Sequence, residues 1–418
     1  MINAPRGTND ILPPESAKWN YIENKAKMIF DLYNYEEIRT PIFEYTELFQ
    51  RGIGEVTDIV EKEMYTFEDK SGRSITLRPE GTASVVRSFL ENKIYGQAQP
   101  TKYYYIGPMF RYERPQAGRY RQFNQLGVEV FGSKDPMIDA EVINVGMHYL
   151  NSLGLKDLKL YINSIGCPSC RPDYLNKLRA YLNDNKDELC DDCKNRIDKN
   201  PLRVLDCKNV QCKSVIDDAP KIVDHLCDEC ETHFENVKTN LSNLEIDYII
   251  DSKLVRGLDY YTKTAFEVKF EGLGAQDTIF GGGRYDKLAE EIGDKDIPGI
   301  GFALGIERLL LTLEKQNIEI PIDKSIDIYL TTIGDKAKKA SFELLNEFRK
   351  ENIKAEIDYM NRSVGGQMKS ADRMNANYTV IIGENELNSG KATVRNMKTG
   401  DEKEIKLDQL VESIEKLI

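Results

Sequence analysis

Hydrophobic and polar positions repeat with two different periods along this chain, and the changes of period divide it into elements. Apolar residues in 19–32 recur at the spacing of one helix face, which predicts an amphipathic helix. A second helix is expected at 81–90, and the uniformly apolar run 302–313 also predicts a helix. Short runs rich in β-branched and aromatic residues predict strands at 35–41, 74–77, 103–106, 123–131, 159–163, 248–250 and 264–270.

The amino-acid composition and the order of expected elements change at two points along the chain. Residues 167–245 are rich in Asp, Lys and Cys and read as mostly helical, so we interpret them as an insertion into a first domain that spans 1–324. After a linker at 316–321, the order is strand, helix, strand, helix, strand, with elements expected at 326–330, 337–349, 355–357, 367–376 and 378–382. That order predicts a small α/β domain with a parallel sheet over 325–418. The expected fold class is therefore α+β, with an antiparallel sheet and flanking helices in the first domain.

Composition narrows the class of protein. The 418 residues are 40% hydrophobic and 30% charged, as in an ordinary soluble globular protein. No run approaches the roughly 20 apolar residues of a membrane span, and the first residues carry no apolar signal segment, so we expect a cytoplasmic protein without a membrane partner. The net charge of -12 argues against electrostatic binding of nucleic acid by the protein surface as a whole, but it allows a local basic binding site.

A stretch dense in arginine stands between two expected strands. Its four arginines are Arg111, Arg114, Arg119 and Arg121. The planar guanidinium fork fits phosphate oxygens, and on a loop between strands such a cluster favours phosphate contact over a merely solvated surface. On the following strand, period two places Gln125, Gly127 and Glu129 on one face, where the glycine would let a ligand approach the backbone. A polar outer face is the alternative.

Three further stretches combine polar residues with glycine. At 76–82, Glu80 could bind an ammonium group, although the residues alone favour a helix cap by Glu80 or Thr82. The segments 254–261 and 281–286 carry glycines that permit close backbone approach, and both include Arg and Tyr. In 299–310, Arg308 is a cation on an otherwise apolar helix, so it needs a carboxylate or a ligand phosphate as partner.

Together these stretches resemble the signature motifs of class II aminoacyl-tRNA synthetases. The helix and strand that end at Pro41 resemble motif 1, residues 110–131 resemble motif 2, and residues 305–308 resemble motif 3. Residues 254–261 and 282–286 resemble the two segments that distinguish histidyl-tRNA synthetases within the class. The resemblance covers essentially the whole chain, and it is weakest in the insertion.

The resemblance implies a role for each matching residue. Arg111 would hold the ATP α-phosphate and the substrate carboxylate, Arg308 the distal phosphates and adenine, and Arg256 the charge developing on the α-phosphorus. The implied catalytic residues are Arg111, Arg256 and Arg308. The implied ATP-binding residues are Arg111, Glu113, Arg119, Arg256 and Arg308. The implied histidine-binding residues are Glu80, Gly81, Thr82, Gln125, Glu129, Tyr260, Tyr261, Gly283 and Tyr285.

The resemblance also implies the reaction and its partners. L-histidine and ATP with Mg²⁺ would form histidyl-adenylate, and the histidine would pass to tRNA(His). The C-terminal domain would bind the anticodon, with Arg362, Lys369 and Arg373 as candidate contacts, and the loop 114–121 would meet the acceptor end. A homodimer would form through the motif 1 region. The chemistry fits, because adenylate formation needs positioning and positive charge more than acid–base groups. The chain's three histidines, His148, His225 and His233, lie outside every motif, so we interpret them as structural or surface residues.

The eight cysteines all fall between 167 and 230, where clustering indicates metal binding before disulfides. A helix expected at 171–189 would separate its two ends by roughly 25–30 Å, so the CxxC pairs at those ends are not expected to share one metal. A returning helix at 213–226 would carry the last pair back. We expect one zinc site from Cys190, Cys193, Cys207 and Cys212, and another from Cys167, Cys170, Cys227 and Cys230. Reduced, packed or solvent-facing thiols are the alternative, since the family does not require zinc here.

Two other functions compete with the ligase. A regulatory paralogue acting in histidine biosynthesis would keep the fold, but it is expected to lack the C-terminal domain and parts of the motifs. Here Arg111, Arg256 and Arg308 are all present, and so is the domain after residue 325. A plain nucleic-acid-binding protein would leave the glycine-rich segments unexplained. The sequence therefore favours the enzyme.

Overall fold

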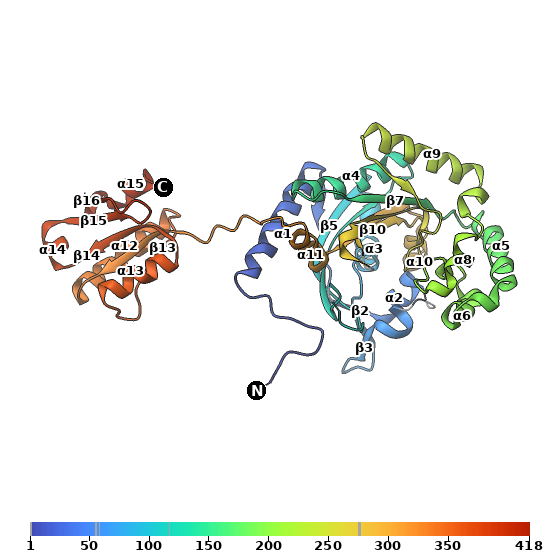
Figure 1. The fold of residues 1–418 in the computed structure, drawn as a ribbon, viewed down its shortest axis with the longest axis horizontal. Helices are drawn as coiled ribbons and strands as arrows, with labels where there is room; N and C mark the ends of the chain where they lie inside the picture. The colour runs from blue at the N-terminus through green and yellow to red at the C-terminus, as the bar shows by residue number, and fades with distance from the viewer. Residues whose placement is uncertain (1, 55–56, 58, 117, 275–276) are drawn as a thin grey trace. The chain divides into compact units, whose positions relative to one another are not determined.

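The computed structural model describes residues 2–54, 57, 59–116, 118–274 and 277–418 (Figure 1). The chain forms two compact units, Met1–Ile320 and Pro321–Ile418. The division falls within the Pro-bearing segment that the sequence suggested as a linker, a few residues before the expected boundary at 324. Among the described residues, no helix is long and apolar enough to cross a membrane.

A large sheet organises the first unit. Its strands, in spatial order, are β1 (Glu36–Glu37), β5 (Thr101–Phe110), β6 (Gln122–Phe131), β11 (Gly299–Gly305), β10 (Thr278–Arg284), β9 (Thr262–Lys269), β7 (Lys159–Ser164) and β8 (Ile249–Ile250). The inner pairs are antiparallel, and among the described strands of this sheet only the edge pairs β1–β5 and β7–β8 are parallel. The expected α+β class with an antiparallel sheet is confirmed.

Each face of this sheet is covered by its own layer. One face packs on α1 (Glu15–Leu32), α4 (Pro136–Ser152), α9 (Asp228–Asn243) and α11 (Ile306–Lys315), through a core that includes Phe30, Tyr149 and Phe266. Towards the other face lie α2 (Thr46–Ile53), α3 (Thr82–Glu91) and α10 (Leu288–Gly293). A small sheet of β2 (Phe43–Tyr45), β4 (Ser74–Leu77) and β3 (Tyr65–Glu68) lies beside α2 and α3 (Figure 1). The second face carries the cavity described below.

The apolar run 302–313 is not one helix, which corrects the sequence-based expectation. Phe302–Gly305 belongs to β11, and the helix α11 begins at Ile306. Strand β11 lies between β6 and β10, and Ile300, Phe302 and Leu304 point into the core. Its other side chains are glycine and alanine, so the strand shows no alternation of polar residues. A short apolar run of this kind cannot be distinguished from a buried helix by periodicity alone.

The insertion is helical but more broken than expected. It contains α5 (Arg171–Asp184), α6 (Asp191–Lys199), α7 (Leu202–Leu205) and α8 (Lys213–Asp217), followed by α9. The helix expected at 171–189 ends at Asp184 and continues only as a 3₁₀ turn, Lys186–Glu188. The helix expected at 213–226 is interrupted after Asp217, because Pro220 cannot donate a backbone hydrogen bond and disfavours helix before it. A separate turn, Ile222–His225, then leads to Cys227.

The second unit is built on a five-stranded sheet. Its order is β13 (Ala355–Ile357), β12 (Ile326–Thr332), β14 (Ala376–Ile382), β15 (Lys391–Asn396) and β16 (Glu402–Lys406). The first three strands are parallel as expected, but β15 and β16 are antiparallel and were not predicted. The helices are α12 (Asp335–Lys350), α13 (Val364–Arg373), α14 (Glu384–Ser389) and α15 (Leu410–Glu415). Helix α13 begins three residues before the expected start because Ser363 caps it by accepting from the Gly366 amide.

Candidate active site

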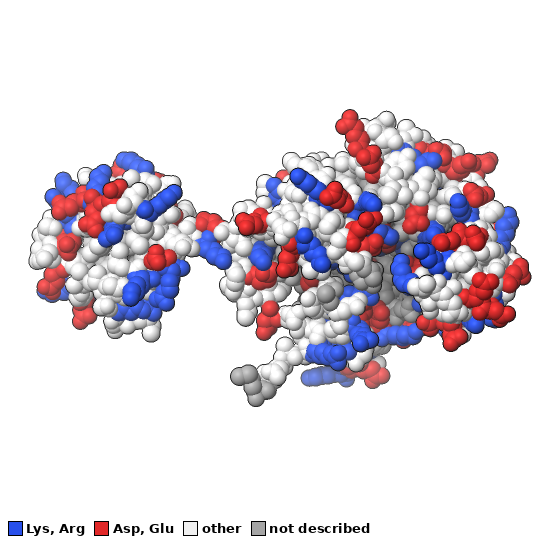
Figure 2. All heavy atoms as spheres, viewed as in Figure 1, with Lys and Arg blue, Asp and Glu red and all other residues white. Residues whose placement is uncertain are grey.

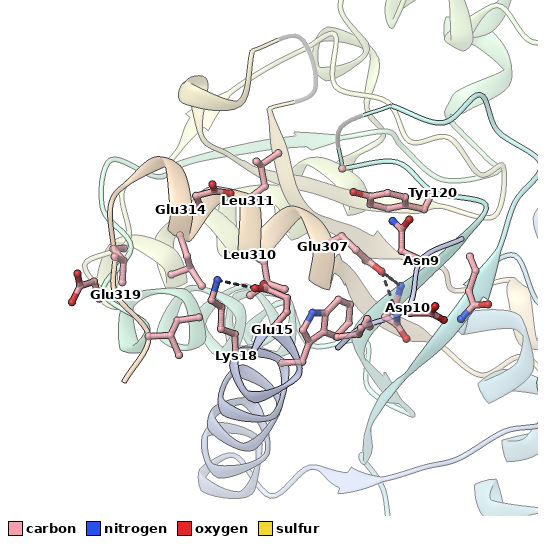
Figure 3. Close-up of a pocket in the computed structure, with 18 of the residues that line it drawn as sticks. Asn9, Asp10, Glu15, Lys18, Tyr120, Glu307, Leu310, Leu311, Glu314 and Glu319 are labelled. Carbon is pink, nitrogen blue, oxygen red and sulfur yellow. Dashed lines mark hydrogen bonds and ion pairs between the residues drawn. The ribbon is translucent and has the colours of Figure 1, made fainter. Parts of the chain in front are cut away.

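Two cavities lie close together in the first unit, and their charges differ. The larger one, about 1090 Å³, lies beside α1 and α11 (Figure 3). Its acidic residues are Asp10, Glu15, Glu307, Glu314 and Glu319. Its single described cation, Lys18, is paired with Glu15 at 2.8 Å. Such a lining would repel phosphate groups, so we do not place the reaction there.

The smaller cavity, of about 240 Å³, lies over β6, β10 and β11. Ten residues that the sequence analysis singled out line it: Glu80, Thr82, Arg111, Glu113, Arg119, Gln125, Arg256, Tyr260, Tyr261 and Arg308. A second layer lies directly behind the lining residues and contacts them; it comprises Gly81, Glu129, Gly283 and Tyr285. We call the side with Glu80, Thr82 and Glu129 the carboxylate end, and the side with Arg111, Arg119, Arg256 and Arg308 the arginine end. Ala117, within the motif 2 loop, lies outside the described residues.

Glu129 is the most deeply buried charge-bearing group at the carboxylate end, with none of its surface exposed. Its carboxyl accepts hydrogen bonds from Thr82 Oγ1 at 2.6 Å and from Tyr285 Oη. Burial raises the pKa of Glu129 to about 8, and the nearby Glu80 adds to the rise against the effect of these hydrogen bonds. The group is therefore poised to exchange or share a proton with a polar ligand near neutral pH.

Glu80 caps the helix α3, as the residues alone suggested. Its Oε2 accepts from the Thr82 amide and its Oε1 from the Ala83 amide, both at 2.8 Å. Burial raises the pKa of Glu80, and those amides oppose the rise. Because each carboxylate oxygen can accept more than one hydrogen bond, capping leaves Glu80 able to accept another from the cavity.

The glycines at this end make room for protein side chains, which corrects the expectation that Gly127 admits a ligand. A Cβ on Gly127 would lie 2.4 Å from Tyr105 Oη, and one on Gly81 would lie 2.3 Å from Tyr105 Cζ. A Cβ on Gly283 would lie 2.9 Å from the Tyr261 ring. Tyr105 was missed by sequence reasoning, since only its alternation along β5 marks it as facing the cavity side.

Two buried polar atoms of the cavity lining have no hydrogen-bond partner among the described residues. They are Gln125 Oε1 and Arg256 Nε. Buried polar groups are nearly always paired, and each unpaired one costs about 1–3 kcal/mol. Their grouping around one cavity indicates that a polar ligand completes it.

The arginines of the cavity are held by backbone carbonyls and carboxylates. Arg111 donates from Nε to Pro79 O at 2.8 Å, and Arg308 donates from Nη1 to Thr278 O at 2.8 Å. Arg119 Nη1 donates to Glu113 Oε2 at 3.1 Å, while Arg111 Nη1 lies 3.8 Å from Glu113 Oε1. Burial lowers the pKa of Arg308, and the charge of Arg119 lowers it further. This crowding of cations favours binding of a polyanion.

Arg256 reaches the cavity from the loop before β9. Its Nη1 pairs with Glu267 on β9, and its guanidinium lies over the Tyr261 ring at 5.7 Å from the centroid. A Cβ on Gly281 would lie 2.4 Å from Arg256 Nη1, so that glycine makes room for the arginine. Glu267 was missed by sequence reasoning, because a Glu within a β-strand carries no signal that it pairs with a distant arginine.

Arg284, in the second glycine-bearing segment, does not reach the cavity. It is fully buried and pairs with Asp139, which also bonds His233 Nε2 at 3.1 Å. Although burial raises the pKa of Asp139, Arg284 and His233 lower it to about 2. This cluster is structural, which agrees with the interpretation of His233 as outside the chemistry.

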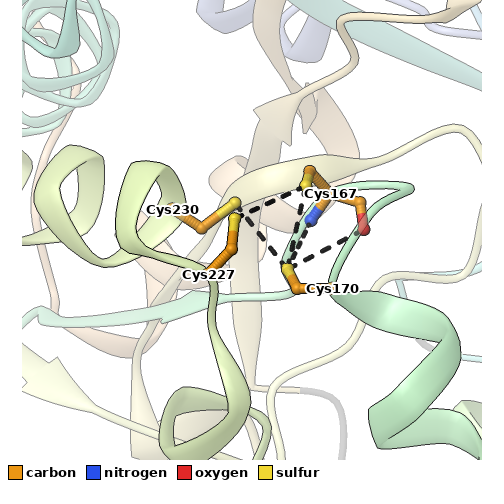
Figure 4. A group of neighbouring side chains, drawn as sticks. All are labelled: Cys167, Cys170, Cys227 and Cys230. Carbon is orange, nitrogen blue, oxygen red and sulfur yellow. Dashed lines mark hydrogen bonds between the residues drawn. The ribbon is translucent and has the colours of Figure 1, made fainter.

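The cysteines come together in the two groups that the sequence analysis expected. The first tetrad is Cys167, Cys170, Cys227 and Cys230 (Figure 4), and the second tetrad is Cys190, Cys193, Cys207 and Cys212. In each tetrad the sulfur atoms lie within 4.8 Å of one another. Neighbouring Sγ atoms of the first tetrad are 3.8–3.9 Å apart, far beyond the 2.05 Å of a disulfide.

One thiol of the first tetrad favours the charged form, whereas burial raises the pKa of Cys230. Although burial raises it, hydrogen bonds from the amides of Cys170 and Ser169 lower the pKa of Cys167 to about 6. The amide of Cys167 in turn donates to Cys170 Sγ at 3.3 Å. Amides aimed at sulfur favour the thiolate form, which is the form that binds a metal.

Comparisons with known proteins agree with this site. The family model described as histidyl-tRNA synthetase matches residues 7–309, and that of an anticodon binding domain matches residues 327–417. The histidine–tRNA ligase of Halothermothrix orenii is 67% identical over 417 residues, which is 100% of both chains.

Solved structures give the same result. The histidyl-tRNA synthetase of S. aureus is 47% identical and matches with a TM-score of 0.85 over 99% of this chain and 100% of that one. A Bacillus halodurans protein described as an ATP phosphoribosyltransferase regulatory subunit/histidyl-tRNA synthetase shares the fold, with a TM-score of 0.62 and 21% identity over 92% of this chain and 98% of that one. The full-length identity and the family model together show that this chain belongs to the histidyl-tRNA synthetase family.

Proposed function

We propose that this chain activates L-histidine with ATP, forming histidyl-adenylate and pyrophosphate, and then transfers the histidine to the 3′ end of tRNA(His). Membership of the family makes it an aminoacyl-tRNA ligase. The observation that carries the proposal is a single cavity with Glu80 in its wall and the raised-pKa carboxyl of Glu129 directly behind Thr82 at one end, and four arginines at the other. Such a cavity suits a small polar substrate joined to a polyphosphate.

The carboxylate end would bind histidine. Glu129 accepts from one imidazole N–H, and the Tyr261 phenol addresses the other ring nitrogen. Glu80, Thr82 and Gln125 hold the ammonium and carboxylate groups. Tyr260 and Tyr285 close the pocket, while Gly81 and Gly283 leave room for the tyrosines around it. An amino acid without both ring nitrogens would leave buried polar groups unpaired, which is the basis of selectivity.

The arginine end would bind ATP as its Mg²⁺ complex. Arg111 contacts the α-phosphate and the histidine carboxylate, and Arg308 contacts the distal phosphates and stacks on adenine. Arg119 and Glu113, which are paired in the structure, lie beside Arg111 and complete this side. Arg256 approaches from a different element and stabilises the charge that develops on the α-phosphorus.

The first step is attack of a histidine carboxylate oxygen on the α-phosphorus, which forms the acyl-phosphate bond and releases pyrophosphate. Its demands are alignment and neutralisation of charge on the equatorial oxygens, which Arg111 and Arg256 meet from two directions. In the second step, a hydroxyl of the terminal tRNA ribose attacks the carbonyl carbon, and AMP leaves. The loop 114–121 would receive that tRNA end.

The second unit would bind the anticodon of tRNA(His). Figure 2 shows Lys and Arg gathered on this unit beside α12 and α13. Arg362, Lys369 and Arg373 are exposed on this unit, and Tyr359, three residues before Arg362, is 56% exposed. Basic groups interleaved with an exposed aromatic ring suit an unstacked RNA loop, because the ring can stack on a base while the cations contact phosphates.

We further propose that the ligase works as a homodimer in the cytoplasm. Around the motif 1 region, large apolar side chains remain exposed: Met28, Leu32, Ile42, Phe43 and Tyr45. An apolar surface of this kind supports burial against a second copy. Sedimentation at micromolar concentration should give the mass of two chains, and a concentration-independent mass of one would contradict the dimer.

Both cysteine tetrads would hold structural Zn²⁺. A tetrahedron with Zn–S bonds of 2.3 Å has edges of about 3.8 Å, which matches the sulfur spacing of the first tetrad. Elemental analysis of the purified protein should find about two zinc ions per chain. A value near zero would favour packed, reduced thiols instead.

The test of the proposed function is ATP–pyrophosphate exchange in the presence of each amino acid, followed by charging of tRNA(His). We expect exchange with histidine alone and charging of the tRNA. A chain that binds histidine without any exchange would instead be a regulatory paralogue that keeps the fold. A chain that binds tRNA but neither histidine nor ATP would be a plain nucleic-acid-binding protein.

A further inference from the structure

The segment Tyr261–Thr262–Lys263, at the start of β9, lies between the histidine pocket and the first tetrad. Lys263 has a left-handed backbone with φ of 48°, which is uncommon for a residue other than glycine. The pairing of β9 with β10 shifts register here, since Gly283 pairs with Ala265 but Arg284 pairs with Thr262. A bulge of this kind redirects the neighbouring side chains, and bulges recur next to active sites.

The backbone of Lys263 is hydrogen-bonded to the loop that directly precedes Cys167 of the first tetrad. Its amide donates to Gly166 O at 2.8 Å, and its carbonyl accepts from the Ile165 amide at 2.7 Å. Gly166 directly precedes Cys167, and a Cβ on Gly166 would lie 2.9 Å from Cys170 Sγ. The shape of the bulge therefore depends on the loop that presents the first two thiols.

Arg171 makes a second connection to the same segment. It directly follows Cys170, and its guanidinium donates to three carbonyl oxygens at once. These are Ile165 O at 3.0 Å, Gly166 O at 3.1 Å and Tyr261 O at 2.6 Å. Through this one side chain, the backbone of a residue that we assign to the histidine pocket is tied to the backbone around the tetrad.

A third connection uses the other half of the tetrad. Lys263 Nζ donates to Glu229 Oε1 at 2.7 Å, and Glu229 lies between Cys227 and Cys230. Lys263 is only 7% exposed, so this ion pair is shielded on the lysine side. Residues that flank the first CxxC pair and one residue within the second thus hydrogen-bond to Tyr261 or Lys263.

The charges are complementary as well. Four thiolates around one Zn²⁺ carry a net charge of about −2, which in a buried site needs nearby cations. Arg171 interacts electrostatically with Cys167, Cys170 and Cys230, and Lys263 interacts with Cys230. The same two cations that would neutralise the metal site also hold the segment Tyr261–Thr262–Lys263 in place. Loss of the metal would therefore weaken the interactions that keep Arg171 and Lys263 in position.

We propose that the first tetrad, with zinc bound, positions Tyr261 for histidine recognition, and that Arg171 is the positioning residue that links the two sites. The inference rests on the proposed histidine pocket and on zinc binding. It assigns to one half of the cysteine-rich insertion a role in substrate affinity. Among the described residues, the hydrogen bonds of the second tetrad's cysteines stay within residues 189–212. The helix that carries Cys193 reaches Asp259 through Asn200, a side-chain contact that does not hold the backbone of residues 261–263, so we expect the second tetrad to have a smaller role.

The first test replaces the Arg171 side chain, which links the two sites, and leaves all eight thiols intact. Arg171→Lys keeps the positive charge but cannot span three carbonyls. We expect zinc content to stay near two per chain and the KM for histidine to rise about tenfold, with the KM for ATP within twofold. The matched control is Arg179→Gln, two turns further along α5. An unchanged KM for histidine in Arg171→Lys, or an equal rise for ATP, would overturn the proposal.

The second test removes one thiol from each tetrad. Cys227→Ser should lose about one zinc per chain and raise the KM for histidine as Arg171→Lys does, and the double variant should add little. Cys190→Ser should also lose about one zinc but raise the KM for histidine much less. Equal effects of Cys227→Ser and Cys190→Ser, or full additivity in the double variant, would contradict the coupling.

A third measurement does not depend on catalysis. Hydrogen exchange at residues 261–263 should become faster in Arg171→Lys and Cys227→Ser, and remain at the wild-type rate in Cys190→Ser. Hydrogen exchange therefore distinguishes a failure of the proposed function from a failure of the link between the first tetrad and Tyr261. If the wild-type chain shows no histidine-dependent exchange of pyrophosphate, the proposed function fails, while faster hydrogen exchange still supports the physical link. If hydrogen exchange is identical in all variants, the link itself is wrong.

Discussion

The two ends of the cavity hold their charged groups in different ways. At the carboxylate end, Glu129 has no exposed surface, and its oxygens accept from Thr82 and Tyr285. At the arginine end, the side chains of Arg111 and Arg256 are 20% and 18% exposed. The first end is sealed and its partners are fixed by the fold, whereas the second is open and held partly by carbonyl oxygens.

This difference matches two different tasks. Recognition of one small side chain requires pre-set polar groups in a dry pocket, because selectivity comes from the cost of leaving them unpaired. Binding of a flexible polyphosphate requires positive charge and access, and its chemistry depends on charge stabilisation in the transition state. The same sheet supports both, since β6 carries Glu129 in its interior and follows the arginine-bearing loop at its start.

The largest expected effect concerns the chemistry of the arginine end. Arg256→Gln removes a cation that would stabilise the α-phosphoryl group, so kcat for histidine-dependent pyrophosphate exchange should fall by about 10²–10³-fold. The KM for histidine should change by much less. The exposed Arg73→Gln variant is the control. A loss of histidine binding equal to the loss of kcat would show that the two ends are not separable.

A smaller effect is expected from packing at the carboxylate end. Gly127→Ala would place a Cβ 2.4 Å from Tyr105 Oη, so the ring must move, at a cost of about 1–3 kcal/mol. We expect kcat/KM for histidine to fall by roughly 10–30-fold, with ATP binding little changed. Gly96→Ala, where a Cβ meets nothing within 4 Å, is the matched control. Wild-type kinetics in Gly127→Ala would mean that Tyr105 does not shape the histidine pocket.

The raised pKa of Glu129 also predicts a dependence of stability on pH. Between its ordinary value near 4.5 and the folded value of about 8, the folded protein holds a proton that the unfolded chain releases. Stability from this group is therefore complete below pH 4.5 and is lost as pH rises towards 8, by at most about 1.4 kcal/mol per pH unit.

Glu129→Gln cannot ionise, so the unliganded variant should gain Tm relative to wild type as pH rises from 5 to 8. Calorimetry at several pH values measures this difference. A Tm difference that stays constant over the range would mean that Glu129 is ionised throughout, and that the carboxylate end is wetter than its burial indicates.

The smallest effect is expected in the second unit. Lys369→Ala should weaken tRNA binding about threefold at moderate salt and reduce the slope of log K against log salt by about one. Binding measured by fluorescence anisotropy at several salt concentrations gives that slope. An unchanged slope would remove Lys369 from the tRNA surface.

Sequence reasoning was most successful where one local pattern determines one outcome. Alternation predicted β6 and put Gln125 and Glu129 on one face, and spacing grouped the cysteines in two tetrads. The predicted grouping of the cysteines is confirmed although α5 is shorter than expected and the returning helix is broken. The prediction depended only on the direction in which each segment carries the chain, not on an unbroken helix.

The rest depended on contacts between distant residues. The strand β11 looked helical because both its faces are buried, and Gly127 looked like a ligand contact because Tyr105 carries no signal that it fills the space. Glu267 and Arg171 find their partners only when the sheet is assembled. Local periodicity does not contain such pairings.

The most direct test of the two-ended cavity compares KM values in Glu129→Ala. We predict that the KM for histidine rises by about 10²-fold or more and that selectivity against other amino acids falls, while the KM for ATP stays within about threefold. If instead the two KM values rise together, or if only ATP binding is lost, Glu129 does not define a separate histidine end and the division of the cavity is wrong.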